Sequence, residues 1–168
     1  MERFILDKIV LRNVADGDVL VFFEQQLDND ANYMAAFTGK DPTDRDAFMM
    51  HWRKILVNKS IIIKTILFNG HIAGHILSHE SFGEPEVSYW IGKDYWGRGI
   101  ATKALSEFLK QTIHIISYPL YARVAKDNIA SIRVLKKCGF TICGEGKGFS
   151  NARGKEIEEL IMKKTTEI

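Results

Sequence analysis

The chain has 168 residues, of which 46% are hydrophobic and 26% charged, and its formal net charge is +2. This size and composition fit one globular domain, residues 1–168, with a core of ordinary size. The mild charge, without a dense block of Lys and Arg, argues against a nucleic-acid partner. The most apolar run, residues 60–68, contains Lys64 and is too short to span a membrane.

Two further features indicate the compartment. Cys138 and Cys143 stand five positions apart, which matches neither a CxxC motif nor a zinc-binding pattern. We expect both as free thiols in a reducing compartment. The first ten residues carry charges where a secretory signal peptide needs an unbroken apolar segment. We therefore expect a cytoplasmic protein without a membrane partner.

The first third of the chain predicts one strand and two helices. Residues 8–12 alternate apolar and polar side chains, which is typical of a strand. Residues 16–26 have helical periodicity, and a second helix follows Thr43 or Asp44, both of which favour the N-cap position. Between these helices, residues 27–46 are acidic and interrupted by glycine and proline, so we expect an irregular loop there.

The rest of the chain predicts a strand meander followed by two helices and three more strands. The expected strands are residues 60–68, 72–79, 86–91, 120–125, 140–145 and 156–162, and the expected helices are residues 99–115 and 128–138. The complete order is β-α-α-β-β-β-α-β-α-β-β. It predicts the α/β class, with a mixed, mostly antiparallel sheet of about seven strands and helices on its faces.

The stretch "YWGRGIATKAL", residues 95–105, places Gly97 and Gly99 between a strand and a helix. Backbone N–H groups at a helix start are unpaired, and the helix dipole adds positive charge, so such a turn suits a phosphate. A plain tight turn is the alternative interpretation of the glycines alone. The dinucleotide fingerprint GxGxxG is excluded because its last position is Thr102, and no GxxxxGK[ST] loop occurs.

A second motif, "NIASIRVLKKCGF" at residues 128–140, lies about thirty residues further on. A helix would place Asn128, Ser131 and Leu135 on one face. Together the two motifs resemble those of the Gcn5-related N-acetyltransferase (GNAT) superfamily, most of all its branch with the ribosomal-protein N-terminal acetyltransferases. The resemblance implies a GNAT fold and acetyl-CoA (coenzyme A after transfer) as the co-substrate.

The resemblance also implies a set of binding residues. The family's glycine loop holds the pyrophosphate of acetyl-CoA, which here implies Gly97, Arg98, Gly99, Ile100, Ala101 and Thr102. The family commonly has Gln or Arg where this chain has Trp96. The pantetheine arm follows the end of the preceding strand, which implies backbone contacts from Trp90 and Ile91. Asn128 resembles the asparagine that hydrogen-bonds the cofactor chain in this family, although a helix cap would also explain it.

The catalytic groups are less well defined. Many family members have a tyrosine acid seven residues after this asparagine, but that position is Leu135, which cannot donate a proton. Ser131, or a water that it holds, is then the candidate acid.

An alkyl amine has a pKa near 10 and must lose a proton before it attacks, so a base is needed as well. Glu86, in a strand position where this branch commonly has Glu, is the candidate base. A helix serine and a strand glutamate without catalytic roles are the alternatives.

No metal is expected. His75 and His79 are four residues apart in a predicted strand, which separates them by about 13 Å, too far to share one ion. The acidic residues 27–46 fall where the family binds its acceptor, and they could attract a cationic amine, although a solvated loop explains them as well. Tyr33, Met34 and Phe37 are candidates for the acceptor pocket, or simply packed residues.

The sequence therefore predicts an acetyl-CoA-dependent N-acetyltransferase. Its acceptor would be a primary amine, either a protein N-terminus or a small molecule, which attacks the thioester directly. The alternative is a catalytically silent acyl-CoA-binding module, an interpretation kept open by Leu135. A homodimer is possible, as among similar proteins.

Overall fold

The computed structural model describes residues 6–166, so the expectation about the signal peptide lies partly outside the described residues. Its strands are β1 (Ile9–Arg12), β2 (Ile62–Phe68), β3 (His71–Ser81), β4 (Glu84–Ile91), β5 (Leu120–Ala125), β6 (Thr141–Ser150) and β7 (Lys155–Lys164). They form one sheet in the order β1-β2-β3-β4-β5-β7-β6. All neighbours are antiparallel except β4 and β5, which are parallel. The predicted class and the mostly antiparallel sheet are confirmed.

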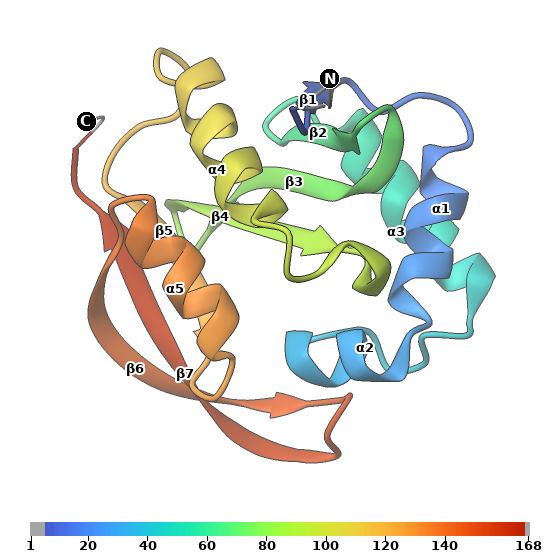
Figure 1. Ribbon diagram of the computed structural model, residues 1–168. Helices are drawn as coiled ribbons and strands as arrows, with labels where there is room; N and C mark the ends of the chain where they lie inside the picture. Colours follow the sequence, from blue (N-terminus) through green and yellow to red (C-terminus); the bar gives the residue numbers. More distant parts are fainter. Residues whose placement is uncertain (1–5, 167–168) are drawn as a thin grey trace, which may run out of the picture.

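The helices cover both faces of this sheet. They are α1 (Asp18–Gln26), α2 (Asn29–Ala35), α3 (Arg45–Val57), α4 (Ile100–Gln111) and α5 (Ile129–Lys137), with a short 3₁₀ turn, η1 (Lys93–Tyr95). Figure 1 shows α4 and α5 in front of the sheet, α1 and α3 beside its other end, and α2 below the end of β4. Within residues 6–166, no helix has the length and apolar character needed to cross a bilayer.

One element differs from the sequence prediction. The sequence predicts an irregular loop over residues 27–46, whereas the structure forms α2 there. Asp28 caps this helix, because its carboxylate accepts a hydrogen bond from the Ala31 N–H at 2.8 Å. With only seven residues, three of them Asn or Asp, α2 is too short and too poor in strong helix formers to show a periodic signal.

Two apolar layers hold the helices on the sheet. The larger one lies under α4 and α5 and includes Leu105, Phe108, Leu120 and Met162, all of them fully buried. On the other face, the rings of Phe22 and Trp52 pack against the ring of His75 on β3, each with its centroid 4.8 Å away. Burial lowers the pKa of His75 to about 3, so this imidazole is neutral and serves as part of the packing.

The sheet opens between β4 and β5. Within the described residues, a single pair, Glu86 opposite Tyr121, joins these two strands. On its other edge, β4 stays paired with β3 as far as Ile91, opposite Gly74. A Cβ at Gly74 would stand 1.9 Å from the carbonyl oxygen of Trp90, so only glycine permits this close approach. Gly74 therefore allows the end of β4 to stay paired with β3 where β5 diverges from β4.

We expect Gly74→Ala to destabilise the protein, because the added methyl group would push the Trp90 carbonyl away from β3. Overpacking of this kind costs about 1–3 kcal/mol in free energy of unfolding, measured by urea denaturation. Gly39→Ala is the control, since a Cβ there meets nothing within 4 Å. Its effect should stay within about 0.5 kcal/mol. Equal stability of the two variants would contradict the close approach at Gly74.

Candidate functional site

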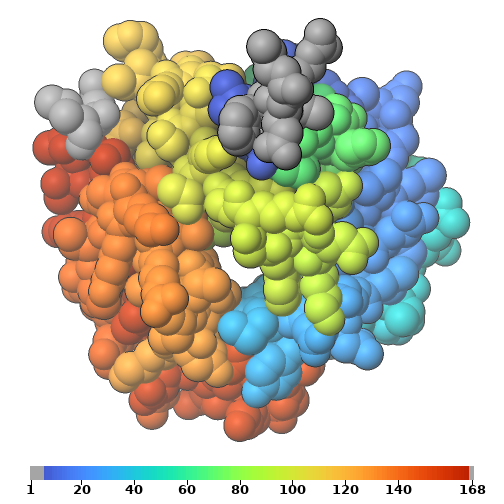
Figure 2. Space-filling view, in the orientation of Figure 1, coloured from blue at the N-terminus to red at the C-terminus, as the bar shows by residue number. Residues whose placement is uncertain are grey.

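A cavity of about 450 Å³ opens where β4 and β5 diverge. This volume lies in the usual range of small-molecule sites. Figure 2 shows the opening between α5, the segment that joins β4 to α4, and α2. The residues predicted to bind the cofactor contribute much of the lining, namely Trp90, Ile91, Gly97, Gly99, Ile100, Ala101, Thr102 and Asn128. Ser131, the candidate acid, lines the same cavity.

The glycine turn presents bare backbone to this cavity. Gly97 and Gly99 have φ values of 75° and 73°, the left-handed region that favours glycine. A Cβ on either residue would meet nothing within 4 Å, so both border open space. No side chain caps α4, and the Lys103 N–H is bonded to the carbonyl of Gly99. The N–H groups of residues 100–102 precede this bond and are suited to an anion, so a pyrophosphate fits the turn.

Some backbone hydrogen-bonding groups at the end of β4 already have partners within the chain. The indole N–H of Trp96 donates to the carbonyl oxygen of Ile91 at 2.8 Å. The Gly92 N–H donates to the carbonyl of Ala73, also at 2.8 Å. A ligand contact to the Ile91 carbonyl would therefore have to share it with Trp96. The aromatic residue found in place of the family's common Gln or Arg thus forms a wall of the cavity at the free end of β4.

The start of α5 carries polar groups into the cavity. The Asn128 side chain caps α5 by accepting from the Ser131 N–H at 3.2 Å, and its Nδ2 donates to the carbonyl of Met34 at 3.3 Å. The Ser131 hydroxyl lies 2.7 Å from that of Tyr89. Leu135 is buried in the core, with 1% of its surface exposed. The position where many family members have tyrosine therefore offers no group to the site.

Sequence reasoning missed Tyr89. The side chain lies two positions after buried Val87, on the same face of β4, so the strand pattern assigns it to the core, and part of its surface does pack there. Burial raises the pKa of Tyr89 to about 12, while the hydrogen bond with Ser131 acts in the opposite direction. Its hydroxyl is therefore protonated at neutral pH and available as a hydrogen-bond donor.

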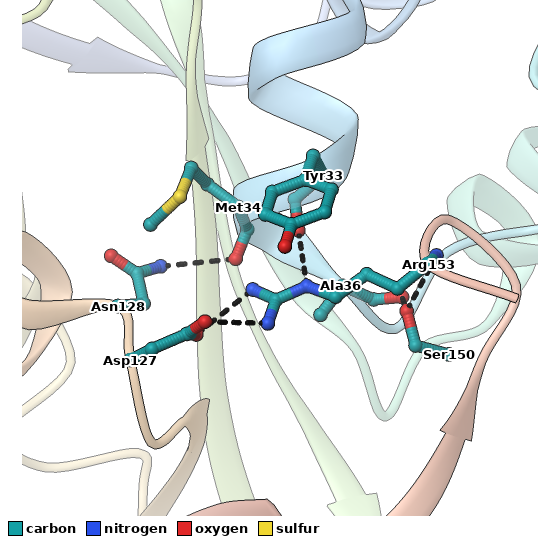
Figure 3. Close-up of polar contacts among 7 residues, drawn as sticks. All are labelled: Tyr33, Met34, Ala36, Asp127, Asn128, Ser150 and Arg153. Carbon is teal, nitrogen blue, oxygen red and sulfur yellow. Dashed lines mark hydrogen bonds and ion pairs between the residues drawn. The ribbon is translucent and has the colours of Figure 1, made fainter. Parts of the chain in front are cut away.

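A cluster that we call the α2 clasp fixes the wall formed by α2 (Figure 3). Its centre is Arg153 in the β6–β7 turn, whose guanidinium binds both carboxylate oxygens of Asp127 at 2.6 and 2.9 Å. The same side chain donates to the carbonyl of Tyr33 at 3.0 Å and lies 4.3 Å from the centre of the Tyr33 ring. Ser150 donates to the carbonyl of Ala36 at 2.6 Å. The clasp joins α2, the β6–β7 turn and the residue that precedes Asn128.

The other end of α2 carries a salt bridge to η1. Lys93 of η1 pairs with Asp30 and lies 3.9 Å from Asp28, and all three side chains are at least a third exposed. Between the two anchored ends, Ala31, Met34 and Ala35 line the cavity. Of the residues proposed for the acceptor pocket, Met34 therefore lines this cavity, whereas Tyr33 belongs to the clasp and Phe37 packs near Gly148.

Two predicted site residues lie outside the cavity lining. Glu86 is half-buried at the one β4–β5 pair, and its carboxylate is 3.6 Å from Arg123 Nε. Arg123 also binds Glu159, at 2.8 Å. Arg98 stacks its guanidinium over the ring of Phe68, 5.6 Å from the ring centre, so its side chain is directed away from the glycine turn's cavity. Within residues 6–166, no group of His, Cys, Asp or Glu side chains is arranged to hold a metal ion.

Comparison with known proteins decides the family. The family model described as "Acetyltransferase (GNAT) domain" matches residues 8–141. The chain belongs to the GNAT acetyltransferase family. This confirms the family expected from the glycine-turn motif and the second motif at residues 128–140.

Known relatives of this GNAT chain are distant. It is 27% identical over 101 residues to "Uncharacterized N-acetyltransferase p20" of Bacillus licheniformis, a match that covers 59% of this chain and 56% of that protein. A second relative, an uncharacterized protein of Methanocaldococcus jannaschii, is 24% identical, and the match covers 83% of this chain but 29% of the relative. The chain thus spans about half, or less, of the curated relatives that it matches.

Solved structures show the same GNAT fold. The ribosomal-protein-alanine N-acetyltransferase of Brucella melitensis superposes with a TM-score of 0.77 at 20% identity, covering 94% of this chain and 99% of that one. The microcin C7 self-immunity acetyltransferase MccE, solved with acetyl-CoA and AMP, has a TM-score of 0.75 at 19% identity, with coverages of 94% and 92%. At such identities the likeness shows the fold alone.

We expect Arg153→Ala to loosen α2, because the variant loses the hydrogen bonds from the buried guanidinium to Asp127 and to the carbonyl of Tyr33. Its side chain is 5% exposed, but that of Asp127 is 58% exposed, so solvent screens the pair and we expect a cost of about 1–3 kcal/mol. Hydrogen–deuterium exchange of residues 29–35 should accelerate. Arg53→Ala on α3, which removes an exposed arginine, should leave this exchange unchanged. Unaltered exchange in Arg153→Ala would refute the clasp.

Proposed function

We propose that residues 1–168 form a single N-acetyltransferase domain that moves the acetyl group of acetyl-CoA to a primary amine. The acceptor is a protein N-terminus or a small-molecule amine, and it attacks the thioester directly. No covalent enzyme intermediate is needed, since neither cysteine lines the cavity. The cytoplasmic location expected from the sequence stays a prediction, and the oligomeric state, for which similar proteins suggest a homodimer, stays open.

The observation that carries the proposal is the glycine turn on the cavity between β4 and β5. The unpaired amides of residues 100–102 suit the diphosphate of coenzyme A, and the free edge of β4 suits an extended chain with amide groups. The chain's membership of the GNAT family supports this assignment, as does the acetyl-CoA held by a protein of the same fold.

The chain's own groups then have definite tasks. The turn at residues 97–102 holds the diphosphate, and the β4 edge at Trp90 and Ile91 holds the pantetheine arm. A backbone N–H of that edge can also stabilise the negative charge that develops on the carbonyl oxygen. The Asn128 amide oxygen accepts one hydrogen bond and its Nδ2 donates one. The second hydrogen of Nδ2 is available to the cofactor. Acetyl-CoA supplies the activated carbonyl that the amine attacks.

The first test is binding followed by turnover. We expect calorimetry to detect coenzyme A at low salt, and Gly99→Ala to weaken this binding by about tenfold or more, because a methyl group enters the anion site and strains the left-handed turn. Gly70→Ala is the matched control, since its φ of 84° imposes the same strain in the β2–β3 hairpin, outside the cavity. It should bind coenzyme A like the wild type.

Turnover separates an enzyme from a silent binder. Acetyl-CoA is offered with a panel of amines that includes peptides with free N-termini, and release of the coenzyme A thiol is followed. Binding without thiol release for any amine would favour the silent acyl-CoA-binding module. Absence of coenzyme A binding at low salt would refute the proposed function altogether.

We further propose that Glu86 accepts the amine proton through water, as the carboxylate held at the apex of the β4–β5 opening. Glu86→Gln should then lower kcat about 100-fold or more near neutral pH and change the pH–rate profile measured between about pH 6 and pH 9, because the variant has no carboxylate to accept the amine proton. Glu159→Gln is the control, because it removes the other carboxylate bound to Arg123. An unchanged profile in Glu86→Gln would exclude Glu86 as the base.

A further inference from the structure

The hydroxyl groups of Tyr89 and Ser131 form a pair across the cavity. Tyr89 comes from β4 and Ser131 from the first turn of α5, the elements on either side of the opening, and the two oxygens are 2.7 Å apart. Both residues line the cavity. The pair therefore brings a proton donor to a site whose usual tyrosine position is occupied by buried Leu135.

A count of hydrogens shows what the pair can do. Two hydroxyls carry two hydrogens, and the bond between them uses one. A serine in a helix can also donate its hydrogen to the carbonyl four residues earlier, here that of Asp127. No such bond is present, since among the described residues Ser131 Oγ bonds only to Tyr89. The remaining hydrogen is thus free for a group in the cavity.

The direction of the bond follows from acidity. Either hydroxyl can donate in this pair, but a phenol is the stronger donor and an alkyl hydroxyl the stronger acceptor, which favours Tyr89 as the donor and leaves the Ser131 hydrogen free. We propose that Tyr89 positions Ser131 as the proton donor of the site and replaces the proton that Ser131 gives up. This inference rests on the proposed function. It assigns a role to a tyrosine on β4, whereas the family's usual tyrosine would stand on α5 at the position of Leu135.

Transfer of the acetyl group conserves atoms and charge. The amine nitrogen bonds to the acetyl carbon, and the carbonyl π electrons move to oxygen. When the carbonyl re-forms, the carbon–sulfur bond breaks and its electron pair stays on sulfur. Ser131 Oγ gives its hydrogen to that sulfur, and Tyr89 gives its hydrogen to Ser131 Oγ. The proton lost by the amine passes through water to Glu86 and from there to solvent, and Tyr89 regains a proton from solvent, which leaves an amide and a free thiol.

The tyrosine matters because serine alone is a poor acid. A serine that loses its proton becomes an alkoxide, a far stronger base than the thiolate that it protonates. With Tyr89 the negative charge ends on a phenolate, which is a much weaker base than an alkoxide. Since the pKa of Tyr89 is raised to about 12 by burial, the donor is fully protonated under working conditions.

The kinetic test compares four variants with the wild type. Tyr89→Phe keeps the ring and removes the hydroxyl, and we expect kcat to fall roughly 10- to 100-fold while KM for acetyl-CoA stays within about twofold. Ser131→Ala should cost at least as much, and Tyr89→Phe combined with Ser131→Ala should be no slower than Ser131→Ala alone. Tyr121→Phe, which removes a hydroxyl from β5 outside the cavity lining, is the control and should match the wild type.

A second readout is independent of turnover. If the Ser131 hydrogen is directed at the sulfur, the bound coenzyme A thiolate is stabilised, and the pKa of the bound thiol is lower in the wild type than in Tyr89→Phe and Ser131→Ala. Thiolate absorbance during a pH titration measures this difference. Equal thiol pKa values in wild type and Tyr89→Phe would overturn the inference.

Other outcomes separate this inference from the proposed function. Additive losses in the double variant, or an equal loss in Tyr121→Phe, would show a structural effect and also overturn it. An active wild type with a fully active Tyr89→Phe would overturn this inference and leave the proposed function standing. A wild type that acetylates no amine in the panel would overturn both.

Discussion

The architecture of the site depends on the single pair that joins β4 to β5, Glu86 opposite Tyr121. Beyond this pair the strands separate, and one edge of β4 loses its neighbour. Backbone N–H and C=O groups need partners, so a free edge inside a sheet is a place where an extended ligand can bind. β3 follows β4 to its end because Gly74 allows contact with the Trp90 carbonyl, and the pairing continues as far as Ile91.

The divergence of β4 and β5 also determines where the groups lie that would bind the diphosphate and transfer protons. It brings the amino-terminal ends of α4 and α5 to one cavity, with the glycine turn on one side and Asn128 and Ser131 on the other. The diphosphate would be held by backbone amides, and protonation of the leaving sulfur is assigned to two hydroxyls, so the cavity needs no charged side chain for either of these two tasks. The carboxylate of Glu86 stays at the apex beside Arg123, outside the cavity lining.

Much of this could be predicted from the sequence, for reasons that are local. The strands of the meander and the helices α4 and α5 have clear periodicity, an Asn-Gly hairpin, and motifs shared with a large family. The parts that were missed depend on distant contacts. Helix α2 is held by side chains of η1 and the β6–β7 turn, and Tyr89 follows a core pattern on β4 although its hydroxyl reaches Ser131. Arg98 looks like a phosphate ligand beside the glycines, but its side chain stacks on Phe68.

The α2 clasp has a consequence for the order in which the molecule assembles. The contacts from Ala36 to Ser150 and from Tyr33 to Arg153 join residues 114 and 120 positions apart. Closing such long loops is entropically costly, and a chain emerging from the ribosome cannot close them until its last hairpin has been made. The meander and α4 can fold earlier from nearby residues, whereas the wall formed by α2 has to wait. A chain stalled before residues 150–153 would therefore carry the glycine turn without a finished cavity, and the pocket is complete only after the β6–β7 turn has been synthesised.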